Sequence, residues 1–325
     1  MSNPKYEEFS NKYMKTCPEL IVPKGKNPFP QMKTDTFRLD AKPGFGGSGS
    51  QVTWGYIHEP LNMFPGLSVS EKPRLIVIMG GDGSNYLKLH GEMEITLGKS
   101  VEDAETFKCD EASAFYVEKD MMYNINVTKV DSQDCPLHFN EFVFGDLAPL
   151  REDEQAEAAD GGEGYAKYIK SGEVLWAKGQ PHHMVVYPVV AAGSHLFDSR
   201  EKIRRTWMPV SVPHTLADKP HSHSFIEFMV FYGTNPNDIS DLGGEMEFTV
   251  GESEDDLTVF KFNKSTIFCM MPGVWHNPMV IKTVNDPKYP INFCEVSQAH
   301  GYTPNSGRTV WIDGSVPTPP PRPAD

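Results

Sequence analysis

Two histidines and one glutamate lie close together in a stretch of sequence that is otherwise almost wholly apolar. The stretch reads HSHSFIEFMVFYG from position 221 to 233 and contains His221, His223 and Glu227. Successive side chains of an extended strand alternate between its two faces, so all three polar groups are expected on one side. A buried carboxylate without a partner costs several kcal/mol or takes up a proton. The sequence therefore predicts a cation beside Glu227, and the histidines favour a metal ion.

A fourth candidate ligand follows in the segment MPGVWHNPMV. Here His276 comes just after a Pro-Gly turn and at the start of another apolar strand. Three histidines and one glutamate around a metal leave one or two coordination positions for water or substrate, as in catalytic sites. The donor set accepts Fe(II), Mn(II), Zn, Ni or Co. We expect one divalent ion, with iron or manganese favoured.

Further residues near these ligands are candidates for a substrate pocket and for proton transfer. Alternation places Phe225, Met229 and Phe231 on the ligand-bearing face, and Trp275 adjoins His276 in the chain. These four side chains would form an apolar pocket suited to a small cyclic or aromatic compound. The candidates for moving protons next to the metal are Tyr232 and Glu295.

The chain contains an internal repeat with an offset of 153 residues. The segment GEMEITLGKSVEDAETFK, which begins at Gly91, returns as GEMEFTVGESEDDLTVFK from Gly244, and about a quarter of positions 53 to 129 are identical in the second copy. With one inserted residue the match continues from PLHFNE (136–141) to PINFCE (290–295). A repeat of this length indicates duplication of a whole domain.

The two copies differ at the positions of the four candidate ligands. The residues of the first copy at these positions are Ser68, Ser70, Arg74 and Tyr123, although its turn glycines and apolar strand positions are retained. The joint loss of all four ligands is what a metal site in one domain alone predicts. Trp54 and Trp207 occupy equivalent positions in both copies, so we expect them in the core and not at a substrate.

Both copies consist of short apolar or alternating segments that end in turn residues, which indicates β-strands. The expected class is all-β. The expected division of the chain is an N-terminal extension (1–50), a first domain without metal ligands (51–148), an exposed acidic connector (149–203), a metal-binding domain (204–300) and a C-terminal extension with a proline-rich tail (301–325). The five dispersed cysteines argue against a disulfide framework, and Cys269 and Cys294 are expected to be buried thiols.

The segments HSHSFIEFMVFYG and PGVWHN resemble the two motifs of the cupin superfamily, H-x-H-x(3,4)-E followed by glycine and P-x-G-x-x-H. With the repeat, the resemblance implies a bicupin, two jelly-roll β-barrels of which one is degenerate. The architecture is similar to that of the large subunit of hydroquinone dioxygenases. The resemblance implies that His221, His223, Glu227 and His276 hold the metal.

The charge and composition of the chain exclude some classes of binding partner. The formal net charge is -14 and the pI about 5.2, so the chain repels nucleic acid and anionic membranes. Neither a signal peptide nor a membrane-spanning segment is visible, so we expect a cytoplasmic protein. A small-molecule substrate, a homodimer and a possible second subunit are the expected partners.

Two classes of function remain open. The first is an enzyme that cleaves a ring or a carbon–carbon bond of a small cyclic or aromatic oxygenated compound, in the manner of a dioxygenase, or a non-redox lyase, isomerase or hydrolase. Cupins with this ligand set include all of these. The second is a non-catalytic cupin that contains a metal and binds a small molecule. An open coordination position favours the enzyme.

Overall fold

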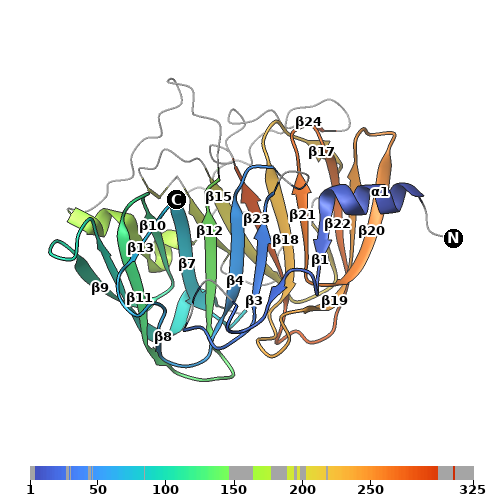
Figure 1. The fold of residues 1–325 in the computed structure, drawn as a ribbon. Coiled ribbons are helices and arrows are strands. Elements are labelled where there is room, and N and C mark those ends of the chain that lie inside the picture. Colours follow the sequence, from blue (N-terminus) through green and yellow to red (C-terminus); the bar gives the residue numbers. More distant parts are fainter. Residues whose placement is uncertain are drawn as a thin grey trace, which may run out of the picture.

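The structure is a computed structural model. It describes residues 4–26, 29, 31–42, 45, 47–83, 85–145, 164–176, 189–193, 196–197, 203–216, 219–298 and 310–311. The acidic part of the connector and the proline-rich tail lie outside these residues. The described chain is almost entirely β-structure, and Figure 1 shows the strands of the first copy on the left and those of the second on the right.

Two sheets form the first barrel. The sheet that faces the other barrel contains, in spatial order, β13 (Ile169–Ser171), β10 (Ser113–Val117), β7 (Arg74–Gly80), β12 (Leu137–Val143), β4 (Gln51–Ile57), β3 (Thr36–Asp40) and β2 (Ile21–Val22). The outer sheet contains β5 (Leu61–Asn62), β11 (Met122–Val130), β8 (Lys88–Gly98) and β9 (Glu105–Glu111), with β6 (Ser68–Val69) paired to β11. All strand pairings are antiparallel.

The second barrel repeats this arrangement. Its inward sheet contains β1 (Met14–Thr16), β21 (Thr266–Met270), β18 (Glu227–Gly233), β23 (Ile291–Ser297), β15 (Arg204–Val210) and β14 (Val190–Gly193). Its outer sheet contains β20 (Leu257–Lys264), β19 (Asp241–Gly251), β22 (Trp275–Val284), β17 (His221–Ser222) and β24 (Val310–Trp311), with β16 (His214–Leu216) paired to β22. The all-β class and the duplicated barrels agree with the sequence analysis.

Burial explains why certain strands are apolar on both faces. Every residue of β18 is buried, and so is every residue of β7 after Arg74. One face of each strand fills its own barrel, and the other packs against the neighbouring barrel, so both faces need apolar side chains. The outer strand β8 instead alternates between more and less buried positions, because one of its faces meets solvent.

Two short strands outside the two copies each pair with the barrel that is more distant from them in the sequence or precedes them, so that the N-terminal strand joins the second barrel and a connector strand joins the first. Strand β1 of the N-terminal extension pairs with β21 of the second barrel, whereas β13 of the connector pairs with β10 of the first. The registers correspond, because Thr16 lies opposite Thr266 as Ser171 lies opposite Ser113. The connector therefore supplies sheet strands to both barrels and is more than an exposed link. The structural repeat also extends into the N-terminal extension and the connector.

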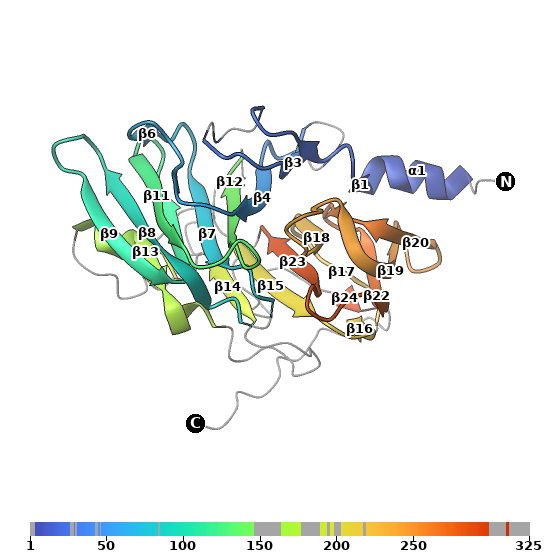
Figure 2. The same ribbon diagram turned by 90° about the horizontal axis from the view of Figure 1, so that it is seen from below.

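Three helical segments complete the described elements. Helix α1 (Pro4–Tyr13) packs on β20 and β21 with Phe9 and Tyr13 buried, and η1 (Gly164–Tyr168) and η2 (Gly172–Leu175) flank β13 (Figure 2). No helix in the described part of the chain has the length and apolar character to cross a bilayer.

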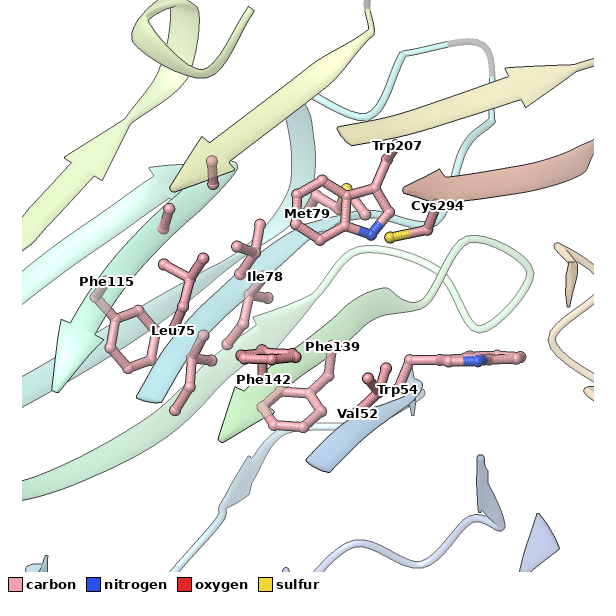
Figure 3. Close-up of a cluster of buried hydrophobic side chains, with 14 of the residues drawn as sticks. Val52, Trp54, Leu75, Ile78, Met79, Phe115, Phe139, Phe142, Trp207 and Cys294 are labelled. Carbon is pink, nitrogen blue, oxygen red and sulfur yellow. The ribbon is translucent and has the colours of Figure 1, made fainter. Parts of the chain in front are cut away.

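The duplicated tryptophans join the two barrels. Trp54 stacks on Tyr232 of the second barrel with 4.3 Å between ring centroids, and Trp207 donates from Nε1 to Oδ1 of Asn140 in the first barrel at 3.0 Å. Both indoles are almost completely buried, as expected for core residues (Figure 3). Cys269 and Cys294 are likewise buried free thiols.

A buried histidine in this interface makes the stability pH-dependent. Burial, and next the charge of Arg205, lower the pKa of His138 to about 3, whereas a histidine in an unfolded chain titrates near 6.5. Between these values the unfolded chain binds one more proton, so this stabilisation is complete above about pH 6.5 and is lost as the pH falls toward 3.

Lowering the pH from 7 to 5 is therefore expected to remove about 2 kcal/mol of the free energy of unfolding through His138. The variant His138→Phe should lack this component, and urea unfolding of both proteins at the two pH values measures it. An identical pH dependence in variant and wild type would show that His138 is not held neutral.

Candidate metal centre

The four candidate ligands converge inside the second barrel from both of its sheets. Strand β17 is only two residues long, and its His221 pairs directly with His276 on β22. Glu227 is the first residue of β18 in the opposite sheet, and His223 lies in the turn between the two strands. Gly273 precedes His276 with a φ of +83°, which a glycine adopts without strain.

The ligand atoms lie at short range. One ring nitrogen from each of the three histidines lies within 4.8 Å of those of the other two. Oε2 of Glu227 lies 3.0 Å from Nε2 of His223 and 3.3 Å from Nε2 of His276. All four side chains are buried, with at most 5% of any residue exposed.

Backbone carbonyls orient two of the imidazoles. Nδ1 of His223 lies 3.1 Å from the carbonyl oxygen of Phe225, and Nδ1 of His276 lies 3.2 Å from that of Val274. Each Nδ1–H donates to its carbonyl, which directs the Nε2 lone pair toward Glu227. Metal-ligating histidines commonly donate their second ring N–H in this way. Asn277 contacts Nδ1 of His221 at 3.3 Å.

The titration of the cluster shows the need for a positive charge. Burial raises the pKa of Glu227, but His223 and His276 outweigh it and hold this pKa well below the usual range. Burial lowers the pKa of His221 to about 3, and it also lowers that of His276. Burial opposes protonation of His223 too, yet Glu227 raises its pKa. Without a metal, His223 therefore carries the proton that balances Glu227.

The geometry fits a metal ion better than this single proton. Nε2 of His276 is buried and makes no hydrogen bond, although a carboxylate oxygen lies beside it. Unprotonated Nε2 atoms and carboxylate oxygens repel one another unless a cation lies between them. Ligand bonds of about 2.1 Å at right angles place neighbouring ligand atoms about 3 Å apart, close to the distances of 3.0 and 3.3 Å from Glu227 to His223 and His276. The residues present fit a mononuclear divalent ion.

A serine links the cluster to Glu295. Oγ of Ser297, a buried residue of β23, lies 2.9 Å from Oε1 of Glu227 and 2.7 Å from Oε1 of Glu295. The hydroxyl has one proton and can donate to only one carboxylate at a time. The hydroxyl of Ser297 thus bridges Glu295, a candidate from the sequence, and the candidate ligand Glu227. The sequence analysis did not predict a role for Ser297.

The four proposed pocket residues differ in their positions. Phe225 stacks on His223 with 3.9 Å between centroids and is half-buried, so it lies at the site. Met229 is two residues from Glu227 on the same face of β18 and opposite Glu295 in register. Phe231 is packed among Phe248, Phe262, Phe268 and Phe293, which makes it part of the barrel core. Trp275 is half-buried, and strand alternation directs it away from the side of His276.

The expectation for Tyr232 is corrected by the structure. This side chain lies on the opposite face of β18 from Glu227, stacked on Trp54 and bonded to Asn292 in the interface between the barrels. Alternation within β18 therefore removes Tyr232 from the site. The expectation of one extended strand is also corrected, because β17 and β18 belong to different sheets and His221 meets Glu227 across the barrel.

The first barrel fills the equivalent place with an arginine. Nη1 of Arg74, the counterpart of Glu227, lies 2.6 Å from Oε1 of Glu141 and donates to the hydroxyl of Tyr123 at 2.8 Å. Nε of Arg74 donates to Oγ of Ser70 at 2.7 Å. By the repeat, Glu141 is the counterpart of Glu295, and Ser70 and Tyr123 are the counterparts of two ligands. A guanidinium thus supplies the positive charge that the second barrel lacks.

Replacing Ser297 tests the support of the site. The variant Ser297→Val carries the residue of the first barrel, where Val143 takes this place, and it removes the hydroxyl that orients Glu227. We expect the affinity for a divalent ion to fall about 10- to 100-fold. Competition with a chelator measures the affinity, and Ser297→Thr should restore it. Equal affinities for Val and Ser would contradict this role.

Replacing Arg74 tests the ion pair of the first barrel. The variant Arg74→Met leaves Glu141 buried without a cation, so the free energy of unfolding should fall by about 3–5 kcal/mol. The double variant Arg74→Met/Glu141→Leu should recover a large part of this loss. Denaturant unfolding of both variants measures the difference, and a double variant no more stable than the single one would contradict the pairing.

Comparisons with known proteins agree with this architecture. A scan against protein-family models found no match, and a search of curated proteins found no relative. Solved structures of oxalate decarboxylase are similar. One, studied for substrate binding and a switch of reaction specificity, has a TM-score of 0.53 and 11% identity over 96% of this chain and 87% of that chain. Another, from Bacillus subtilis and studied for its Mn(II) centres, has a TM-score of 0.52 and 12% identity over 86% of this chain and 75% of that chain. The similarity shows the fold, and the chain has the bicupin fold that its repeat and motifs predicted.

Proposed function

We propose that this protein is a mononuclear-metal enzyme that cleaves a carbon–carbon bond in a small oxygenated substrate. One observation supports the proposal above the others, namely the three histidines and Glu227 gathered around one point with the Ser297–Glu295 pair beside them. The four metal ligands by themselves would be equally consistent with a structural metal site. A carboxyl group one hydroxyl away from the ligands adds a group that can move a proton.

The preferred reaction is decarboxylation of a small acid whose carboxylate lies next to a carbonyl group or one carbon from it. A bound divalent ion would polarise the carbonyl or carboxylate oxygen. The bond to the carboxylate carbon breaks, carbon dioxide leaves, and the electron pair stays on the substrate until a proton reaches it. Glu295 supplies that proton, and Ser297 holds Glu295 in place. The similarity to oxalate decarboxylase favours this class of lyase.

Apolar side chains around the ligands would exclude water from this step. Met270 lies opposite Glu227 in register, and the ring of Phe248 lies 6.3 Å from that of His276. Met229 borders Glu295. In such surroundings the charges of the site act more strongly than in water.

An oxygen-dependent cleavage of an aromatic ring is the second candidate. The flat stacking of Phe225 on His223, with an interplanar angle of 5°, offers an aromatic face at the site. The resemblance to the large subunit of hydroquinone dioxygenases, which the repeat and the motifs suggest, would favour the same reaction. This reaction consumes O2, so it is separable from decarboxylation by measurement.

The experiment begins with the metal content of protein purified without oxygen. The loaded protein is then assayed for carbon dioxide release from oxalate, 2-oxo acids and β-keto acids, and for O2 uptake with hydroquinones, catechols and cyclic diketones. Carbon dioxide release without O2 uptake supports the lyase, and substrate-dependent O2 uptake supports the dioxygenase. A loaded protein that turns over neither group would contradict both.

Two variants separate metal binding from proton transfer. The variant His276→Ala should lose the metal and the activity together, whereas Glu295→Gln should keep the metal and lose about 100-fold or more in kcat. The variant His58→Ala, which changes a half-buried histidine of the first barrel, serves as the control and should keep both. An active Glu295→Gln protein would remove Glu295 from the mechanism.

A further inference from the structure

A buried arginine in the interface between the barrels has no anionic partner among the residues that the structure describes. Arg205 lies on β15 with 1% of the residue exposed, and its guanidinium is always protonated. Its Nη2 reaches only the sulfur of Cys294, at 3.8 Å, and its charged group lies over the ring of Trp207 at 4.7 Å. Nε and Nη1 make no hydrogen bond within the described chain.

A buried charge without a partner is strongly unfavourable. The protein itself shows the usual solution in Arg74, whose guanidinium meets Glu141, Ser70 and Tyr123. By contrast, the neighbours of Arg205 in register, Ala192 and Val296, are apolar. No ion pair between described residues includes Arg205, so its charge lacks compensation within the described part of the chain.

Further hydrogen-bond donors near Arg205 also lack acceptors. They are Nε1 of Trp54, Nδ2 of Asn140, the hydroxyl of Tyr86 and the protonated ring nitrogen of His138. The rings of Trp54, Tyr86 and Tyr232 surround His138 at centroid distances of 5.4 to 6.1 Å. Arg205 acts on both His138 and Tyr232 electrostatically, so these groups share one region. This region, the interface cluster, gathers several donors around one positive charge, together with the unpartnered acceptor Oδ1 of Asn292, and no described carboxylate pairs with Arg205.

The first barrel shows that packing does not require a cation at this place. Val52 is the counterpart of Arg205 in the repeat, and it is buried in the same interface (Figure 3). An apolar residue therefore fills the equivalent position without any charge. Arg205 places a buried charge, which is unfavourable, where the fold tolerates valine. A ligand that binds the guanidinium would explain why an arginine is present.

We propose that a small monovalent anion binds at Arg205 between the two barrels. Halide, nitrate or formate matches the site, because the available groups are N–H and O–H donors around one positive charge. Trp54, Trp207 and Tyr232 are all buried beside this region, so a small anion suits the site better than a large one. Water could accept hydrogen bonds from these donors, but it would leave the charge of Arg205 uncompensated. The site lies on the face of the inward sheet opposite the metal ligands and does not depend on the proposed enzymatic function.

Thermal unfolding at constant ionic strength tests the proposal. Sodium gluconate, whose anion is too large for the interface, is replaced stepwise by chloride, nitrate or formate. At an anion concentration about a hundred times the dissociation constant, the midpoint should rise by about 4 °C above that in gluconate. Equal midpoints in all four salts would overturn the proposal.

Variants locate the effect. The variant Arg205→Val, which carries the residue of the first barrel, should fold, keep its metal content and show no difference between chloride and gluconate. The variant Arg205→Met provides a second test if valine is poorly tolerated. The variant Arg38→Met, at a half-buried arginine of the first barrel that is paired with Asp40, should keep the wild-type response to chloride. A response that persists in both Arg205 variants would place the anion elsewhere.

Crystals of the wild-type protein grown in bromide give the position directly. Anomalous scattering from bromide should produce a peak within hydrogen-bond distance of the Arg205 guanidinium. Density without an anomalous signal at this place would identify water and contradict the proposal. This measurement needs neither a variant nor an active enzyme.

Discussion

A carboxylate inside an apolar barrel needs a positive charge beside it, and the second barrel is organised around this requirement. Glu227 is buried, and the surrounding groups hold its pKa far below the usual range. Backbone carbonyls direct His223 and His276 so that their Nε2 atoms face the same carboxylate oxygen. A divalent ion at that point satisfies all of these groups at once, whereas a single proton on His223 leaves Nε2 of His276 without a partner.

The two barrels answer the same requirement in opposite ways. In the first, the cation is part of the chain, because Arg74 occupies the place of Glu227 and binds Glu141. In the second, Glu227 takes the place of that arginine and is joined to Glu295 through Ser297. One duplicated fold therefore carries an internal ion pair in one half and a site for an external ion in the other. The first barrel balances its buried carboxylate with its own arginine, and among the described residues the three-histidine group lies in the second.

Strand alternation explains what the sequence could predict and where it failed. Residue type and spacing predicted that His221, His223 and Glu227 lie together, but the expected reason was wrong, because the chain bends after β17 and His221 reaches Glu227 from the opposite sheet. The repeat indicated which barrel lacks the four ligands. Alternation within β18 excludes Tyr232. Contacts between distant segments could not be predicted from the sequence, because no pattern near Ser297 or Glu141 indicates which residues they contact. The exchange of β1 and β13 was missed because strands of three residues give too weak a pattern.

The central claim is that one divalent ion lies among His221, His223, Glu227 and His276, and nowhere in the first barrel. Anomalous diffraction from crystals of the metal-loaded protein, recorded on both sides of the absorption edge of the metal, tests this claim most directly. The account predicts one peak at about 2.1 Å from the histidine nitrogens and a carboxylate oxygen of Glu227, and no peak near Arg74. A peak outside these ligands, or none in loaded crystals, would contradict it.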